Sequence, residues 1–236
     1  MKHTADIQKT PRHFLSPEFV LTDWHSLESY FQLLAERDIS TVENLEQWLR
    51  DQSELEAAIS EDACWRQIRM TCDTENKALE DSFNFFCMEI QPRIQPHADA
   101  LNKKLMQSPA LDQLDKEKYH TYLRNVSKSI ELFREENISL QAETSVLQQQ
   151  YGQISGAMTI EHEGRQYTLQ QAAKFLEDRD RGVRETIYRK IQDRRLQDRD
   201  ALNELFDKLL ALRNQTARSE EHTSELQSRQ YLVCRL

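Results

Sequence analysis

The chain of 236 residues carries 31 Lys and Arg against 40 Asp and Glu, which gives a formal net charge of -9. Nucleic acids and anionic membranes select clustered Lys and Arg, so this acidic balance argues against both as partners. The N-terminal residues contain no apolar core of a signal peptide, and no window approaches the roughly 18 apolar residues of a membrane span. We therefore expect a cytoplasmic protein.

Hydrophobic residues make up 38% of the chain and charged residues 30%, and the apolar positions recur at spacings of three and four. This pattern is typical of long amphipathic helices and not of a disordered chain. A chain of this length can bury a core without disulfides or a bound metal. We predict an all-α, mainly helical fold with one small β-hairpin near residues 156–168.

The first predicted elements are three helices that follow an irregular start. Thr22 is expected to cap the first helix. The second is expected to begin at Ser40, because Glu43 three residues later would complete a capping box. A long third helix is expected to open at Ser60 and to end at Pro92, since proline breaks a helix interior.

Shorter helices should follow, separated by prolines. Their predicted boundaries are Pro96 and the pair Ser108-Pro109. The apolar spacing then predicts a further helix from Lys116 to about Glu136.

One segment departs from helical periodicity. Over residues 154–168, β-favouring residues flank Glu163-Gly164, which predicts a hairpin with a tight turn. Thr168 and Gln171 are spaced for another capping box, which should start a short helix that ends at Leu176.

The last predicted element is one long helix whose apolar stripe runs from Val183 to Leu212. From Arg218 to Leu236 the residues RSEEHTSELQSRQYLVCRL leave that pattern and match the conceptual translation of a short-read sequencing adapter. We therefore predict natural protein sequence over 1–217 and an artefactual tail over 218–236. A frayed polar C-terminus is the alternative.

The segment His162-Glu163-Gly164-Arg165-Gln166 comes nearest to a zinc peptidase motif. That motif needs two histidines one helical turn apart, with a glutamate between them as general base. Gln166 stands in place of the second histidine, and the segment lies in a predicted hairpin. We predict no metal site there.

The cysteines and the remaining histidines stand singly. The cysteines form no CxxC pair and have no histidine at ligand spacing, so we expect core thiols in a reducing compartment. They are Cys64, Cys72, Cys87 and Cys234. The histidines are expected to be surface or core residues and not ligands. They are His3, His13, His25, His97, His120 and, in the predicted tail, His222.

Three further features have a structural and a functional interpretation. Six aromatic residues are predicted to be mostly core, with a groove for apolar peptide side chains as the alternative; they are Phe83, Phe85, Phe86, Tyr119, Tyr122 and Phe133. Charges alternate over 178–184 and 192–200, which favours a solvated face over a peptide-binding patch. Ser155-Gly156 could form a tight turn against a neighbouring backbone, and no base marks Ser155 as a nucleophile.

Longer stretches of the sequence resemble a known family. They are RMTCDTEN at 69–76, ELFREENISLQ at 131–141, GAMTIEHEGRQYTLQQAA at 156–173 and YRKIQDRRLQDRDALNELFDKLLALRNQ at 188–215. From about Phe14 to Ala217 the chain resembles the N-terminal part of oligoendopeptidase F-type zinc metallopeptidases, which are similar to thimet oligopeptidase.

The resemblance implies a helical, cytoplasmic enzyme with two lobes around a deep channel that admits short peptides. It also implies one zinc ion held by an HExxH helix and a later glutamate, all downstream of residues 1–217. The chain would then be the N-terminal lobe, with no catalytic, cofactor-binding or metal-binding residue of its own, and zinc would belong to the full-length parent. The alternative is a stand-alone helical interaction or peptide-binding module without catalysis. The sequence indicates no oligomeric state.

Overall fold

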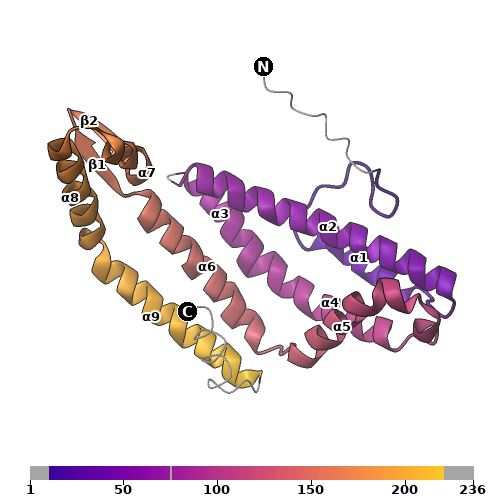
Figure 1. The fold of residues 1–236 in the computed structure, drawn as a ribbon. Coiled ribbons are helices and arrows are strands. Elements are labelled where there is room, and N and C mark those ends of the chain that lie inside the picture. Colours follow the sequence, from indigo (N-terminus) through magenta and orange to yellow (C-terminus); the bar gives the residue numbers. More distant parts are fainter. Residues whose placement is uncertain (1–10, 75, 221–236) are drawn as a thin grey trace. The chain divides into compact units, whose positions relative to one another are not determined.

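The computed structural model describes residues 11–74 and 76–220, which are mainly helical and include one two-stranded antiparallel hairpin (Figure 1). The predicted fold class is confirmed. The chain divides into two compact units, and each is described by itself. The first consists of Met1–Trp65 and Glu89–Phe133, and the second of Arg66–Met88 and Arg134–Leu236. None of the described helices is long and apolar enough to cross a bilayer.

The first unit is a group of helices around a leucine-rich core. Its elements are α1 (His25–Glu36), most of α2 (Val42–Cys72), α4 (Gln91–Met106), the short 3-10 helix η2 (Leu111–Gln113) and α5 (Lys116–Leu132). Among the described residues, the largest fully buried side chain is Trp48, whose indole Nε1 donates a hydrogen bond to the carbonyl of Leu34 at 2.9 Å. This bond joins α2 to the last turns of α1.

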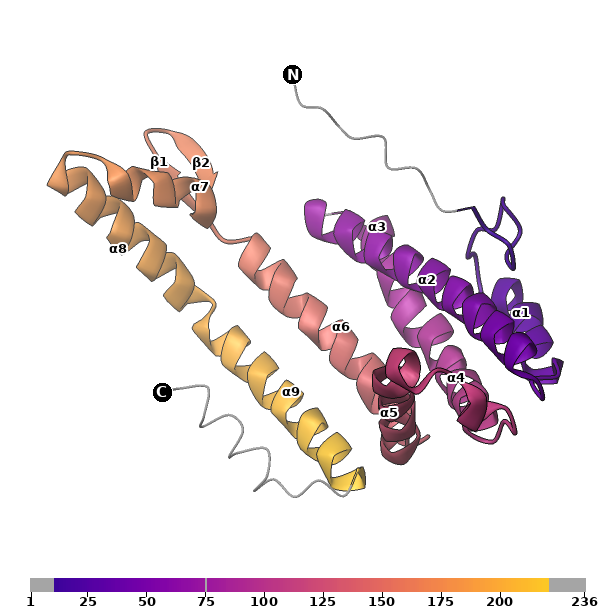
Figure 2. The same cartoon turned by 45° about the vertical axis from the view of Figure 1, so that its right-hand side comes forward.

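The second unit joins a helical pair to the hairpin. Its elements are the end of α2, α3 (Lys77–Phe85), most of the π-helical turn η1 (Phe86–Ile90), α6 (Asn137–Gly156), β1 (Thr159–His162), β2 (Arg165–Thr168), α7 (Leu169–Ala173), the 3-10 helix η3 (Lys174–Glu177), α8 (Arg181–Gln197) and α9 (Arg199–Ser219). Helices α6 and α9 run antiparallel, side by side (Figures 1 and 2). The hairpin, α7 and α8 share one buried cluster, made of Met158, Ile160, Leu169, Ala172, Ile187 and Ile191.

The predicted caps of the first two helices are wrong. Trp24, and not Thr22, is the N-cap of α1 and makes no side-chain cap bond, while Asp23 Oδ1 just before it accepts the Ser26 N–H at 3.1 Å. Thr41, and not Ser40, caps α2, because its Oγ1 accepts the Asn44 N–H at 3.3 Å. Both corrections have one cause: adjacent polar residues compete for the same orphan amides, and the local backbone decides between them.

The helix predicted to begin at Ser60 does not exist as a separate element. Helix α2 runs through Ser60 without interruption, because serine in a helix interior costs only a fraction of a kcal/mol, roughly 0.5. The helix ends later, at Cys72, and the next helix, α3, begins at Lys77. There Asn76 caps α3 by accepting the Ala78 N–H on its Oδ1 at 3.2 Å.

Pro92 does not end a helix either. It occupies the first turn of α4, directly after the π-helical turn η1, and Pro96 lies inside α4. A proline has no N–H for the carbonyl four residues earlier, here Met88. A wider turn lets a carbonyl take an N–H five residues on, so the π-turn carries the helix past Pro92. The predicted boundary at Ser108-Pro109 is close, since α4 ends at Met106.

Between residues 132 and 156 the structure differs from the prediction. Helix α5 ends at Leu132, four residues early, because Phe133 turns extended with ψ 127°. Helix α6 has no counterpart among the predicted elements, and it includes Ser155 and Gly156. The expected tight turn there is therefore wrong: Gly156 is helical, and a Cβ added to it would lie 3.7 Å from the Thr74 side chain.

The hairpin itself is confirmed. Glu163 and Gly164 form its turn with φ of 51° and 76°, and Ile160 faces Tyr167 across the strands. The Thr168–Gln171 capping box is also present and starts α7. The single long helix predicted beyond it is wrong, because Asp198 separates α8 from α9.

The predicted artefactual tail mostly lies outside the described residues. Only its first three residues are described, and α9 continues through Ala217 to Ser219. The Ser219 hydroxyl donates to Oδ1 of Asn137 at 2.6 Å.

Two glycine substitutions should change stability in opposite directions. Gly164→Ala is expected to lower the free energy of unfolding by about 1 kcal/mol, because only glycine adopts its positive φ without strain. Gly152→Ala is the matched control and should raise it by roughly 0.5 to 1 kcal/mol, since Gly152 lies within α6 and its added Cβ would meet nothing within 4 Å. Chemical denaturation of both variants checks the signs, and a loss of stability in both would contradict the placement of Gly152 in an open helical position.

A carboxylate on α2 holds the segment that precedes α1. Glu54 accepts the backbone N–H groups of His13, Phe14 and Leu15 at 2.9 to 3.2 Å. Burial raises the pKa of the Glu54 carboxyl, but the three amides outweigh burial and hold its pKa below the ordinary value of 4.5. The stabilisation is therefore complete above the unfolded pKa and is lost as the pH falls through the folded pKa.

Replacing Glu54 should make this segment's stability insensitive to acid. Glu54→Gln is expected to cost about 1 to 2 kcal/mol at neutral pH, after allowance for partial exposure, and less below pH ~4. Glu61→Gln, an exposed carboxylate on the same helix, is the control and should cost little at either pH. The free energy of unfolding is measured at neutral pH and below pH ~4. An equal loss for Glu54→Gln at the two pH values would contradict the prediction.

Candidate functional site

The segment that most resembles a zinc motif lies at the tip of the hairpin. His162 lies in β1, and its ring packs against Phe175 with centroids 4.9 Å apart. Glu163 is 82% exposed at the turn, and Gln166 faces Glu161 across the hairpin. His162 Nε2 lies 3.9 Å from Glu163 Oε1, but Gln166 lies on the opposite face of the hairpin from His162, because successive strand residues alternate between faces. No group of three or more His, Cys, Asp or Glu side chains that could hold a metal lies within 11–74 and 76–220.

The cysteines are only partly core residues. Cys87 is buried, and burial raises the pKa of its thiol to about 11. Cys64 and Cys72 are exposed on α2, so the expectation of core thiols is wrong for these two. They face solvent because the last turns of α2 bury little of their surface. Cys234 lies outside the described residues.

The described single histidines have separate surroundings. The His13 backbone binds Glu54, His25 lies 3.4 Å from Glu28, and His97 stacks on Trp24 with centroids 4.7 Å apart. His120 borders a pocket described below. His3 and His222 lie outside the described residues.

The six aromatic residues are less buried than predicted. Only Phe86 is buried, while Phe85 and Tyr122 are 41% and 37% exposed. Tyr119 is partly buried and donates its hydroxyl to Glu46 at 3.1 Å. None of the six lines either of the two pockets described below.

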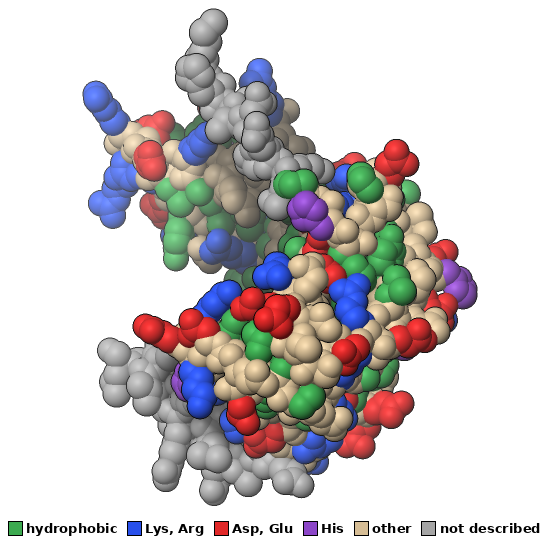
Figure 3. Space-filling view, turned by 90° about the vertical axis from the view of Figure 1, so that its right-hand side faces the viewer, with side chains coloured by type: hydrophobic (Ala, Val, Ile, Leu, Met, Phe, Trp, Pro, Cys, Tyr) green, Lys and Arg blue, Asp and Glu red, His purple; other side chains and the backbone are tan. Residues whose placement is uncertain are grey.

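The alternating charges lie on exposed helix surface. Within 178–184, Asp180 caps α8 by accepting the Gly182 N–H at 2.7 Å, and within 192–200 Arg194 pairs with Asp198. On the face of the molecule drawn in Figure 3, acidic and basic side chains are also interspersed. Exposed pairs of this spacing are worth about 0.3 to 0.5 kcal/mol each, but Arg194 and Asp198 are partly buried, with side chains 21% and 26% exposed.

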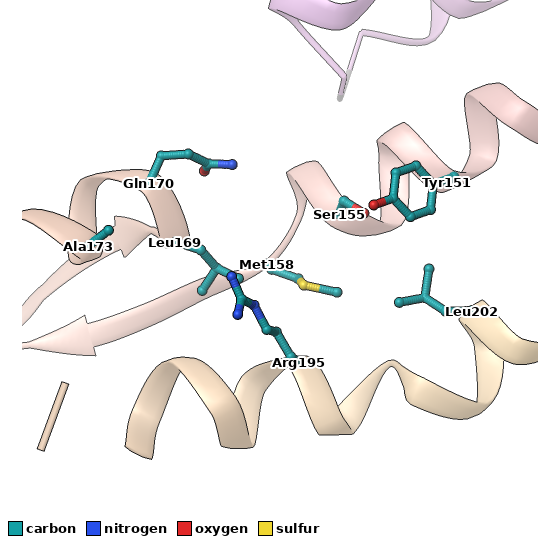
Figure 4. A pocket seen from close by; sticks show the side chains of 8 residues that line it. All are labelled: Tyr151, Ser155, Met158, Leu169, Gln170, Ala173, Arg195 and Leu202. Atoms are coloured by element: carbon teal, nitrogen blue, oxygen red, sulfur yellow. The ribbon is translucent and has the colours of Figure 1, made fainter. Parts of the chain in front are cut away.

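The second unit contains an open pocket of about 450 Å³ beside the hairpin (Figure 4). Four elements and one connecting residue build it. Tyr151 and Ser155 come from one face of α6, since they are four residues apart. Met158 leads from α6 into β1. Leu169, Gln170 and Ala173 come from α7, and Arg195 and Leu202 lie on either side of the break at Asp198.

The pocket combines an apolar floor with a polar rim. Met158 and Leu169 are buried members of the core cluster, and Leu202 packs against that cluster. Tyr151 and Arg195 are exposed. Figure 4 shows Arg195 rising from α8 toward Leu169, with the Tyr151 hydroxyl turned toward Ser155. The arrangement can bind an apolar group below a polar or anionic one, and it contains no nucleophile paired with a base.

Sequence reasoning missed most of this pocket. Ser155 was predicted only as a turn residue, and Arg195 as part of a solvated charge run. The available signal was the four-residue spacing of Tyr151 and Ser155, which would have placed both on one face of α6 had that helix been predicted.

The first unit contains a second pocket of about 370 Å³ between the end of α4 and α5. Its apolar lining is Met106, Leu111, Leu114 and Leu123, and its polar lining includes His120 and Arg124. Within the described residues, the His120 ring forms no hydrogen bond or ion pair with another titratable group. The pocket therefore shows no pairing of groups suited to catalysis.

The peptidase M3 N-terminal domain matches this chain over residues 14–133, just over half of its length. The chain belongs to the peptidase M3 family through this N-terminal domain. The resemblance predicted from the sequence is thereby confirmed. A search of curated proteins found no match.

Solved structures share the fold. A protein described as oligoendopeptidase F, solved at 3.1 Å, matches 85% of this chain with a TM-score of 0.78 and 21% identity. An oligoendopeptidase F of Bacillus anthracis matches 87% with a TM-score of 0.79 and 20% identity. PZ peptidase A with an inhibitor matches 84% with a TM-score of 0.77 and 20% identity.

This chain spans little more than a third of those structures. It covers 36%, 38% and 36% of their lengths, respectively. At about 20% identity the likeness establishes the fold and not the chemistry.

Proposed function

We propose that this chain is the N-terminal region of a zinc metalloendopeptidase that hydrolyses short oligopeptides. The observation that carries the proposal is the match of the M3 N-terminal domain to residues 14–133. The fold shared with oligoendopeptidase F and PZ peptidase A structures supports it. Peptidases of the M3 family use zinc.

In this proposal the chain binds and admits peptides, while the chemistry belongs to another part of the parent. The described residues do not fit zinc, because Gln166 supplies no imidazole and lies on the opposite face of the hairpin from His162. We assign no catalytic, cofactor-binding or metal-binding residue to the chain. Residues 1–217 would form a wall of the substrate channel, which restricts the length of peptide that enters.

Two further assignments belong to the same proposal. We assign residues 218–236 to an artefactual tail, on the strength of their match to adapter sequence. We place the parent in the cytoplasm, which the unpaired thiols of Cys64, Cys72 and Cys87 support.

A cleavage assay on the parent tests the proposal. The longer protein, loaded with zinc, should cut an internally quenched short peptide, lose activity on chelation and regain it with added zinc. The 236-residue chain should cut nothing under the same conditions. Cleavage that survives chelation, or no cleavage by the parent, would contradict the peptidase assignment. Cooperative folding of residues 1–217 with tight binding of a partner would then favour a stand-alone helical module.

A further inference from the structure

The pocket beside the hairpin has the dimensions and chemistry of a binding site for part of a small ligand. Its volume of about 450 Å³ falls within the roughly 300 to 1,000 Å³ of typical ligand pockets. Met158, Leu169 and Leu202 provide a floor that is continuous with the core of the unit. An apolar side chain entering the pocket would therefore leave water and contact the packed core cluster.

A positive charge that has no partner in the described part of the chain lies at the rim of this pocket. Arg194, the neighbouring arginine, pairs with Asp198, but Arg195 takes no ion pair or hydrogen bond through its side chain within the described residues. The side chains of Tyr151, Ser155 and Gln170 are likewise without hydrogen-bond partners in the described part of the chain. A guanidinium with neutral donors beside it binds a carboxylate well, because it donates two parallel N–H groups.

The geometry favours a ligand that carries a carboxylate and an apolar group close together. Arg195 and Leu169 line the same pocket, so the charge and the apolar floor border one cavity (Figure 4). In the last residue of a peptide, the α-carboxylate and the side chain leave the same carbon atom. One terminal residue can therefore reach both surfaces, whereas a glutamate side chain presents its carboxylate without an apolar branch.

We propose that this pocket binds the C-terminal residue of a short peptide, with its carboxylate on Arg195 and an apolar side chain on Met158, Leu169 and Leu202. This rests on the proposed function, which supplies peptides as the ligand class. The pocket is a binding subsite and not a catalytic one. It would prefer peptides that end in leucine or a similar residue over peptides that end in an acidic or amidated residue.

Calorimetric titration of the 236-residue chain tests this with three acetylated pentapeptides that differ only at the C-terminal end. They end in leucine with a free carboxylate, in leucine amide, and in glutamate amide. The leucine acid should bind about fivefold to tenfold more tightly than either amide, the size expected for a charged hydrogen bond at a partly solvated site. Arg195→Leu should abolish the difference, and Arg195→Lys should retain part of it.

Arg189→Leu is the matched control, because Arg189 is an exposed arginine on the same helix that pairs with Glu185. It should leave the preference for the acid unchanged. The subsite would be overturned if either amide bound as tightly as the leucine acid, or if no peptide bound at all. It would also be overturned if Arg189→Leu lost the preference for the acid to the same extent as Arg195→Leu. Chelator-sensitive cleavage by the parent is measured separately, so the subsite can fail while the peptidase assignment stands.

Discussion

Trp48→Ala is expected to lower the free energy of unfolding by about 3 to 5 kcal/mol, the largest loss among the substitutions proposed for this chain. Trp48 lies on α2 and is fully buried, and its removal leaves a cavity that the neighbouring leucines cannot fill. It also removes the hydrogen bond from Nε1 to the Leu34 carbonyl. That carbonyl keeps one donor, because Lys104 Nζ lies 3.0 Å from it, so the cavity dominates the loss.

The matched control for this prediction is Trp65→Ala. Trp65 lies on the same helix but is 49% exposed, so its removal should cost less than about 1 kcal/mol. Guanidinium unfolding followed by far-UV circular dichroism measures both variants. Equal losses would show that the core of the first unit is not centred on Trp48.

Ile187→Ala is expected to cost about 2 to 4 kcal/mol and to loosen the hairpin. Ile187 is fully buried on α8, in the cluster that contains Ile160 of β1 and Ala172 of α7. A two-stranded hairpin is marginal by itself and depends on packing against a helix. Amide hydrogen exchange at Ile160 and Tyr167 should therefore accelerate in this variant.

Leu196→Ala provides the control on the same helix, because Leu196 is 61% exposed. It should leave hairpin exchange close to that of the unchanged protein. Hairpin amides that stay protected in Ile187→Ala would contradict the dependence of β1 and β2 on α8.

The parts of the fold that the sequence predicts well are those in which one local rule acts without competition. The turn at Glu163-Gly164 needs two positive φ angles, and the Thr168–Gln171 capping box needs only a three-residue spacing. Both are present in the structure. The helical class follows from apolar periodicity in the same way.

The errors occur where neighbouring interactions outweigh a local rule. Ser60 fits an N-cap, yet α2 continues because the helix gains more from its next turns than from a cap. Pro92 would end a regular α-helix, but the π-turn just before it admits the proline. The break at Asp198 interrupts an apolar stripe that looks continuous, with Arg194 paired to the Asp198 carboxylate.

The candidate site could not be predicted for a related reason. Its residues come from α6, α7, α8 and α9, and only their packing brings Tyr151 and Arg195 to one pocket. Each is an ordinary surface residue in the sequence. The family, by contrast, was predictable because the resemblance extends over several segments.

Sequencing the source DNA from the codons of Leu212 to Ala217 onward tests the central claim most directly. If the chain is the N-terminal region of a zinc peptidase, the natural reading frame continues from Ala217 without the adapter-like segment and encodes an HExxH motif followed by a downstream glutamate. A genuine stop codon at that point, with no such motif, would contradict the assignment of this chain to a zinc peptidase.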